Sequence, residues 1–166
     1  MNELEKLAET LGGELLARGE WLAAAESCTG GWLAQSVTAI AGSSGWFERG
    51  FVTYSNAAKV DMLGIAETTL ERHGAVSEAT ARAMAQGALK HSKADWTVAV
   101  TGIAGPGGGT PDKPVGMVCF AWAQRDGGCE ALTCNFSGDR AEIREQAVRR
   151  ALSGALKRAM AATLMA

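Results

Sequence analysis

The sequence predicts an α/β fold: a three-layer α/β/α sandwich whose mixed, mostly parallel sheet includes a late antiparallel hairpin. Strand-like and helical segments alternate through the first half of the chain, which favours a parallel sheet with helices on both faces. The segment WTVAVTGI, residues 96–103, is apolar, β-branched and followed by glycines, as buried strands are. The turn RDGG at 125–128 joins two further strand-like segments, which must then be antiparallel.

The first half of the chain supplies a helix and then two strand–helix units. Leucines recur at helical spacing near the N-terminus, so residues 2–18 form an amphipathic helix in this interpretation. Apolar runs bounded by turn residues predict the elements that follow: a strand at 21–25, a helix at 28–40 that AGSSGW ends, a strand at 48–54, and a helix at 56–63 that Asn56 caps.

The second half supplies a helix, three strands and a final helix. SEATARAMAQGALKHS has a cap-like start at Ser77 and predicts a helix that precedes the strand at 96–103. VGMVCFAWAQ and CEALTCNFSG flank the RDGG turn as the two hairpin strands. One long helix over 138–164 closes the chain, with Asp139 near its cap. No linker or repeat interrupts these elements, so we expect one domain over residues 1–166.

The composition narrows the class of protein. Sixteen Lys and Arg against 18 Asp and Glu give a formal net charge of −2, which does not indicate binding to nucleic acid or to an anionic membrane. No apolar run approaches the roughly 20 residues of a membrane span, and the charged N-terminus does not resemble a signal peptide. Four cysteines without a CxxC pair and two histidines offer no metal-ligand spacing. We therefore expect a cytoplasmic protein that needs no metal or cofactor.

The ends of three predicted strands deliver candidate site residues. They are Ser27, the run from Tyr54 to Lys59, and the run from Thr101 to Pro106. Ligands of open α/β sheets bind beyond the carboxyl ends of the strands. These three loops are therefore expected to converge on one site.

The stretch AAAESCTGGW, residues 23–32, has three interpretations. Ser27 suits a helix N-cap, which contributes about 1 kcal/mol. Successive N–H groups at residues 29–31 would suit a bound phosphate or an oxyanion. The third interpretation is a catalytic nucleophile, at Ser27 or at Cys28. The surroundings are not the GxSxG elbow of α/β-hydrolases, because Glu26 precedes the serine.

A serine nucleophile needs a base, and neither histidine is well placed to be one. His73 precedes a glycine at a helix end, and His91 lies in the polar tail of a helix, positions that suit solvated or capping roles. A lysine serves as a base when burial or nearby positive charge lowers its pKa. Lys59 lies between a strand, a polar cap and an apolar helix, and the alternative for it is a solvated first-turn lysine. Tyr54 is a further hydrogen-bond donor there.

Two further segments point to binding. The loop GIAGPGGGTPDKP fits neither the GxxxxGK[ST] phosphate loop nor the GxGxxG dinucleotide fingerprint, yet loops of this length in compact domains are usually functional. Arg140 begins the last helix, where a cation is unfavourable. It either holds an anion such as a phosphate or forms a surface salt bridge.

The whole chain resembles one known family. Four segments carry the resemblance: AESCTGGWLAQSVTAIAGSSGWFERGFVTYSNAAKVDMLGI, HGAVSEATARAMA, AVTGIAGPGGGTPDKPVGMV and FSGDR. In order and spacing they resemble the CinA C-terminal domain family over about residues 4–162. The resemblance implies a serine amidohydrolase that converts nicotinamide mononucleotide and water to nicotinate mononucleotide and ammonia, in pyridine-nucleotide (NAD) recycling. It also implies a metal-free pair, with Ser27 as nucleophile and Lys59 as base.

That reaction suggests roles for the remaining candidates. Tyr54 would orient the lysine or the amide. N–H groups near Thr29, Gly30 and Gly31 would stabilise the oxyanion of the tetrahedral intermediate. Ribose and 5'-phosphate would be held by a set from the third loop and the last helix: Thr101, Gly102, Gly105, Pro106 and Arg140.

Two alternatives stay open from the residues alone. Cys28 is a better nucleophile as a thiolate, and a helix N-terminus lowers the pKa of a thiol, so a thiol hydrolase is one alternative. A non-catalytic nucleotide-binding module, with the glycine loops as phosphate cradles, is the other. In each case the expected partner is a small nucleotide, and apolar segments that carry tryptophan favour a homodimer.

Overall fold

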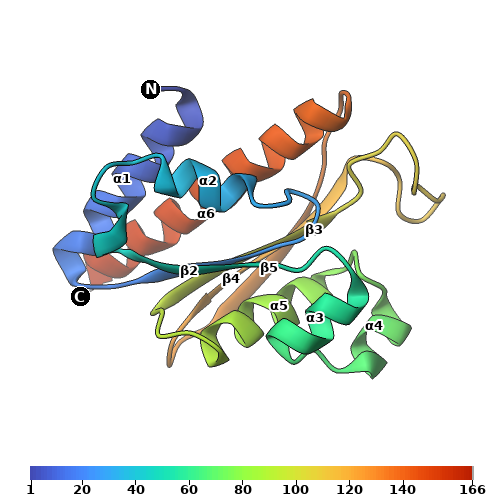
Figure 1. The fold of residues 1–166 in the computed structure, drawn as a ribbon, viewed down its shortest axis with the longest axis horizontal. Coiled ribbons are helices and arrows are strands. Elements are labelled where there is room, and N and C mark those ends of the chain that lie inside the picture. The colour runs from blue at the N-terminus through green and yellow to red at the C-terminus, as the bar shows by residue number, and fades with distance from the viewer. Residues whose placement is uncertain (166) are drawn as a thin grey trace.

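The computed structural model describes residues 1–165, which form one five-stranded sheet (Figure 1). The strand order is β2-β1-β3-β4-β5, and the bounds are β1 (Leu22–Glu26), β2 (Phe47–Val52), β3 (Trp96–Gly102), β4 (Met117–Gln124) and β5 (Cys129–Asn135). β1 runs parallel to both β2 and β3, whereas β3 with β4 and β4 with β5 are antiparallel. The predicted mixed sheet with a late hairpin is confirmed.

Helices cover both faces of this sheet, as the sandwich prediction requires (Figure 1). One face carries α1 (Glu3–Arg18), α2 (Trp32–Thr38) and α6 (Arg140–Met165), and the other carries α3 (Asn56–Leu63), α4 (Glu67–His73) and α5 (Glu78–Lys90). A short 3-10 turn, Ser43–Gly45, leads into β2. Within residues 1–165, the helices all lack the combination of length and apolar character that crossing a bilayer requires.

The core has two layers because successive side chains of a strand point to opposite faces of the sheet. Val98 and Val100 of β3 are fully buried in the layer that α1, α2 and α6 cover, together with Trp122. Ala99, which lies between the two valines, belongs to the other layer and packs with Met84 of α5. Because β1 is parallel to both β2 and β3, the loops that follow these three strands leave from the same end of the sheet.

Two elements differ from the sequence prediction. The helix expected at 28–40 begins only at Trp32, because residues 28–31 form a turn that ends at Gly31 with a φ of 103°. In addition, α4 was not predicted as a separate element between the helix predicted at 56–63 and the helix predicted from Ser77. α4 has no side-chain N-cap, so the usual start signal is missing there.

The start of α6 is well defined. Asp139 Oδ1 accepts a hydrogen bond from the Glu142 N–H at 2.9 Å, and Glu142 Oε1 accepts one from the Asp139 N–H at 3.0 Å. This reciprocal capping confirms the cap predicted at Asp139. The first turns of α6 carry two arginines, Arg140 and Arg144.

Candidate active site

The three predicted loops meet at one cavity of about 290 Å³. The parallel strands β1, β2 and β3 all end at this edge of the sheet. Predicted site residues that line the cavity are Ser27, Tyr54, Lys59, Thr101, Gly102, Gly105 and Arg140, and Cys28 and Asn56 line it as well. Pro106, in contrast, does not line the cavity, although its neighbours Gly105 and Gly107 do.

Ser27 and Lys59 are in contact. Ser27 directly follows β1, and its N–H donates to the Val100 carbonyl at 3.0 Å, which ties it to β3. Its Oγ lies 3.0 Å from Lys59 Nζ. The amine also donates to the Thr53 carbonyl at 2.9 Å, a contact that the sequence analysis missed. The structure thus brings the predicted nucleophile and base within hydrogen-bonding distance.

The surroundings of Lys59 favour its neutral form. The side chain is 1% exposed although it lies in the first turns of α3. Burial lowers the pKa of the Lys59 amine below its usual value, because the charged form loses its hydration. Among residues 1–165, the salt bridges include none to Lys59, so no carboxylate in contact restores the charge. The solvated first-turn lysine of the sequence analysis is therefore excluded.

Glu26, the last residue of β1, fills the N-terminus of α2. It is fully buried, and its Oε1 accepts hydrogen bonds from the Thr29 hydroxyl at 2.7 Å and from the Leu33 N–H at 2.8 Å. Oε1 also accepts from the Gly31 N–H at 3.2 Å, and Oε2 accepts from the Ala34 N–H at 3.0 Å. The anion that the glycine-containing turn holds is therefore a side chain of the protein itself.

This arrangement occupies two of the three N–H groups of the expected cradle at Thr29, Gly30 and Gly31. None of the three lines the cavity. The Gly30 N–H donates to the Ser27 carbonyl at 3.0 Å, and the Gly31 N–H is taken by Glu26. The sequence signal for Glu26 was a carboxylate placed just before a helix start, where the helix dipole favours negative charge.

Cys28 lies in a different environment from the one its sequence position suggested. Its side chain is 6% exposed and belongs to the core layer under α1, α2 and α6. Burial raises the pKa of the Cys28 thiol to about 12. The helix N-terminus that was expected to lower this pKa already holds the Glu26 carboxylate. Cys28 is therefore held as a neutral thiol.

Arg140 joins two of the loops at the mouth of the site. Its Nη1 donates to the Gly105 carbonyl at 2.7 Å, and its Nη2 donates to the Tyr54 hydroxyl oxygen at 2.9 Å. Tyr54 is 62% exposed and contacts this arginine instead of orienting the lysine, whose second partner is Thr53. Thr101 lines the cavity while its hydroxyl donates to the Ala75 carbonyl at 2.7 Å.

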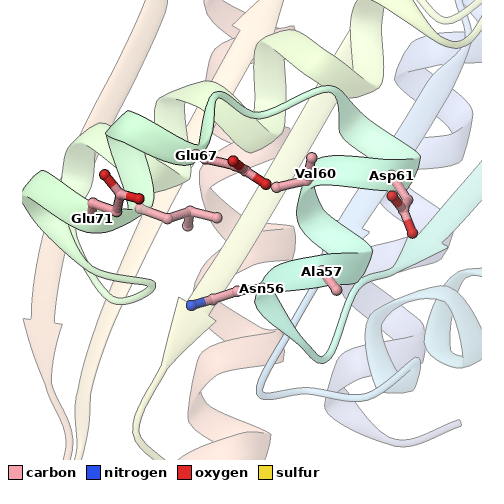
Figure 2. A pocket seen from close by; sticks show the side chains of 7 residues that line it. Asn56, Ala57, Val60, Asp61, Glu67 and Glu71 are labelled. Atoms are coloured by element: carbon pink, nitrogen blue, oxygen red, sulfur yellow. The ribbon is translucent and has the colours of Figure 1, made fainter.

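The charges around the cavity at Ser27 and around a larger cavity elsewhere on the same face of the sheet as α3 and α4 are opposite in sign. In the described part of the chain, Arg140 has no carboxylate within salt-bridge distance, so its charge is uncompensated at the smaller cavity. The larger cavity, about 510 Å³ between α3 and α4, carries three carboxylates, Asp61, Glu67 and Glu71 (Figure 2). An anionic ligand is repelled there. Of these two cavities, the one at Ser27 is better suited to a phosphate-bearing molecule.

The fold described above is that of the CinA C-terminal domain family, and the chain belongs to this family, whose model matches residues 4–159. The chain is 56% identical over 152 residues to the nicotinamide-nucleotide amidohydrolase PncC of Escherichia coli K12, covering 91% of this chain and 92% of that protein. It is 52% identical over 154 residues to the PncC protein of Enterobacter agglomerans, covering 93% and 94%. The crystal structure of the competence/damage inducible protein CihA from Agrobacterium tumefaciens matches with a TM-score of 0.91 at 48% identity, covering 95% of this chain and 97% of that one.

Proposed function

We propose that this protein hydrolyses the carboxamide of nicotinamide mononucleotide to give nicotinate mononucleotide and ammonia. Relatives that are 52% and 56% identical over more than nine-tenths of the chain are named nicotinamide-nucleotide amidohydrolases, which makes this chain an amidohydrolase. The observation that carries the assignment of residues is the buried contact of 3.0 Å between Ser27 Oγ and Lys59 Nζ.

In the first half of the reaction, Ser27 Oγ attacks the carboxamide carbon and Lys59 takes the hydroxyl proton. The amine can do so because burial favours its neutral form, while the Thr53 carbonyl holds one N–H and so fixes the direction of the nitrogen lone pair. When the C–N bond breaks, the lysine returns this proton to the leaving nitrogen. Ammonia leaves and an acyl-serine ester remains.

In the second half, water attacks the ester. Lys59 takes a proton from the water and returns it to Ser27 Oγ as the C–O bond breaks, which releases nicotinate mononucleotide and restores the enzyme. One lysine therefore serves as base and acid in both halves. No step requires a metal.

The oxyanion of each tetrahedral intermediate needs a hydrogen-bond donor next to Ser27. The Cys28 N–H fits, because within residues 1–165 no other residue accepts a hydrogen bond from it and Cys28 lines the cavity. In α/β-hydrolases the residue after the nucleophile supplies such an N–H. Removal of one donor of this kind typically lowers kcat by about 10²–10³.

The nucleotide would lie with its phosphate toward Arg140 and its nicotinamide toward Ser27. An arginine that bonds only neutral groups retains its charge for the ligand, and guanidinium groups bind phosphate through paired N–H donors. Thr101, Gly102 and Gly105 would then contact the ribose, since they line the same cavity.

The two alternative functions are less well supported. A thiol hydrolase needs a Cys28 thiolate, whereas this thiol is buried and its pKa is about 12. A passive binding module does not account for a buried lysine placed on a serine hydroxyl, because burying an amine destabilises the fold. The cytoplasmic location, NAD recycling and the homodimer stay predictions from the sequence.

The test is ammonia release from nicotinamide mononucleotide by the purified protein. We expect turnover by the wild type and by Cys28→Ala, and losses of several orders of magnitude in Ser27→Ala and Lys59→Met. Cys28→Ala is the matched control because it changes the neighbouring side chain and leaves the N–H in place. Turnover by Ser27→Ala at the wild-type rate would overturn the assignment of the nucleophile. Absence of ammonia from the wild type would overturn the function.

A further inference from the structure

A second arginine of α6 contacts the turn that carries the nucleophile. Arg144 Nε donates to the Cys28 carbonyl at 3.1 Å, and its Nη2 donates to the Thr29 carbonyl at 3.0 Å. The guanidinium also lies 5.5 Å from the ring centroid of Trp32, the first residue of α2. A single side chain of the last helix thus reaches the carbonyl groups of the two residues that follow Ser27.

These contacts are made to carbonyl oxygens, not to a carboxylate. Across the described residues, no salt bridge involves Arg144. The rigid fork of a guanidinium fixes the orientation of the two groups that it bonds, which a lysine amine cannot do in the same way. Arg144 therefore acts on the direction of the backbone and does not neutralise a charge.

The geometry of the turn leaves little other support for these peptide units. The Ser27 carbonyl accepts from the Gly30 N–H, and the Thr29 carbonyl accepts from the Trp32 N–H at 3.0 Å, but the Cys28 carbonyl has only the Arg144 contact among the hydrogen bonds of residues 1–165. Gly30 has a φ of 58°, and a Cβ there would lie 3.4 Å from Arg144 Nη2. The positive φ favours glycine at this position, directly beside the guanidinium.

We propose that Arg144 is a positioning residue for the hydrolysis: it holds the Cys28 and Thr29 carbonyls so that the Cys28 N–H stays directed at the oxyanion that forms next to Ser27. The Cys28 N–H belongs to the planar unit whose Ser27 carbonyl accepts from the Gly30 N–H, and Arg144 holds the next planar unit through the Cys28 carbonyl. With both units held, rotation about the Cys28 Cα, which would turn the N–H away, is restricted. This inference rests on the proposed function, because the reaction it concerns is the proposed one. The contacts of Arg144 are observed independently of that function.

The first test compares Arg144→Gln, Arg144→Lys and Arg149→Gln with the wild type in steady-state ammonia release. Arg149 is the matched control, since it lies on α6 but pairs with Glu3 and Glu145 at the surface. We expect kcat to fall about 10- to 100-fold in Arg144→Gln with KM changed by less than about 3-fold, because a misplaced oxyanion donor affects the transition state and not substrate binding. Arg149→Gln should match the wild type.

Two measurements separate positioning from a loss of structure. Arg144→Lys keeps the aliphatic stem beside Trp32, so its circular dichroism and melting should stay close to wild type while kcat still falls. Guanidinium chloride at millimolar concentration should restore part of kcat to Arg144→Ala and none to Ser27→Ala. Wild-type kcat in Arg144→Gln, a rise in KM at constant kcat, or activity that simply follows the folded fraction overturns the inference.

A second reaction keeps this inference distinct from the proposed function. Phenylmethylsulfonyl fluoride forms an Oγ–S bond on a reactive serine as the S–F bond breaks, with loss of the proton and fluoride, and a charged oxygen develops on sulfur. If the wild type releases no ammonia, the proposed function fails, and the rate of Ser27 labelling decides the role of Arg144. Slower labelling in Arg144→Gln than in Arg149→Gln supports positioning, and equal rates overturn it.

Discussion

Glu26→Gln tests whether the charge of Glu26, and not its volume, holds the start of α2. Glutamine has nearly the same shape, so the substitution opens no cavity in the core. Its amide oxygen can replace Oε1 and keep the contacts to Thr29, Gly31 and Leu33. Its NH₂ group then faces the Ala34 N–H, which loses its acceptor at Oε2.

The expected loss of stability follows from these contacts. An unsatisfied buried donor costs about 1–3 kcal/mol, and hydrogen bonds to a charged acceptor contribute more than those to a neutral one. One orphaned N–H and three weakened bonds together predict a decrease of about 3 kcal/mol in the free energy of unfolding. For a chain of this length, that corresponds to a melting temperature lower by roughly 6–12 °C.

Urea unfolding followed by tryptophan fluorescence measures this change. The control is Glu9→Gln, which removes a carboxylate from an exposed position of α1 and should change the free energy of unfolding by less than about 0.5 kcal/mol. If the free energy of unfolding decreases no more in Glu26→Gln than in the control, the reasoning is refuted. The four donors that bond the two carboxylate oxygens of Glu26 would then contribute nothing measurable through its charge.

Three further predictions concern Lys59, Cys28 and the packing of α6. Since burial lowers the Lys59 pKa, the unfolded chain binds more protons than the folded chain at pH values between the lowered pKa and 10.5. The free energy of unfolding, measured with urea, should therefore rise for the wild type relative to Lys59→Met as pH increases through this window. A difference between the two proteins that stays constant with pH would contradict this. Iodoacetamide at neutral pH should leave Cys28 of the folded protein unmodified, because its thiol is buried and has a pKa of about 12, while the half-buried Cys129 should react faster. Mass spectrometry measures both reactions, and rapid labelling of Cys28 would count against this environment. Gly154→Ala should lower the free energy of unfolding by roughly 1–3 kcal/mol, because its Cβ would overlap the indole of Trp122. Gly13→Ala on α1 has open space at its Cβ and should raise the free energy of unfolding by about 0.5–1 kcal/mol. Equal effects of the two substitutions would show that the indole moves to accommodate the new methyl group.

Much of the fold was predictable because its signals are local. Leucine spacing indicated α1, the RDGG turn indicated the β4–β5 hairpin, and Asp139 indicated the start of α6. The convergence of the loops at Ser27 and Lys59 followed from a rule of topology, since parallel strands end at the same edge of a sheet.

The remaining features of the site depend on contacts between distant parts of the chain. Thr53 acts through its backbone carbonyl, which no residue pattern marks. Arg144 reaches a turn more than a hundred positions earlier, and a helical arginine in a charged segment has no sequence signal for such a contact. Glu26 was visible as a residue, but its four donors become apparent only when the turn and α2 are folded around it.

The occupied N-terminus of α2 has a consequence for the direction in which a substrate enters. Because Glu26 already satisfies this helix end, the N-terminus of α2 offers no attraction to a phosphate, whereas Arg140, which lines the same cavity as Ser27, does. A molecule with one anionic end and one neutral amide therefore has one favourable orientation. In the proposed reaction the neutral amide end becomes a carboxylate beside the Lys59 amine, whose charged form is disfavoured by burial, so the product would be held less well than the substrate.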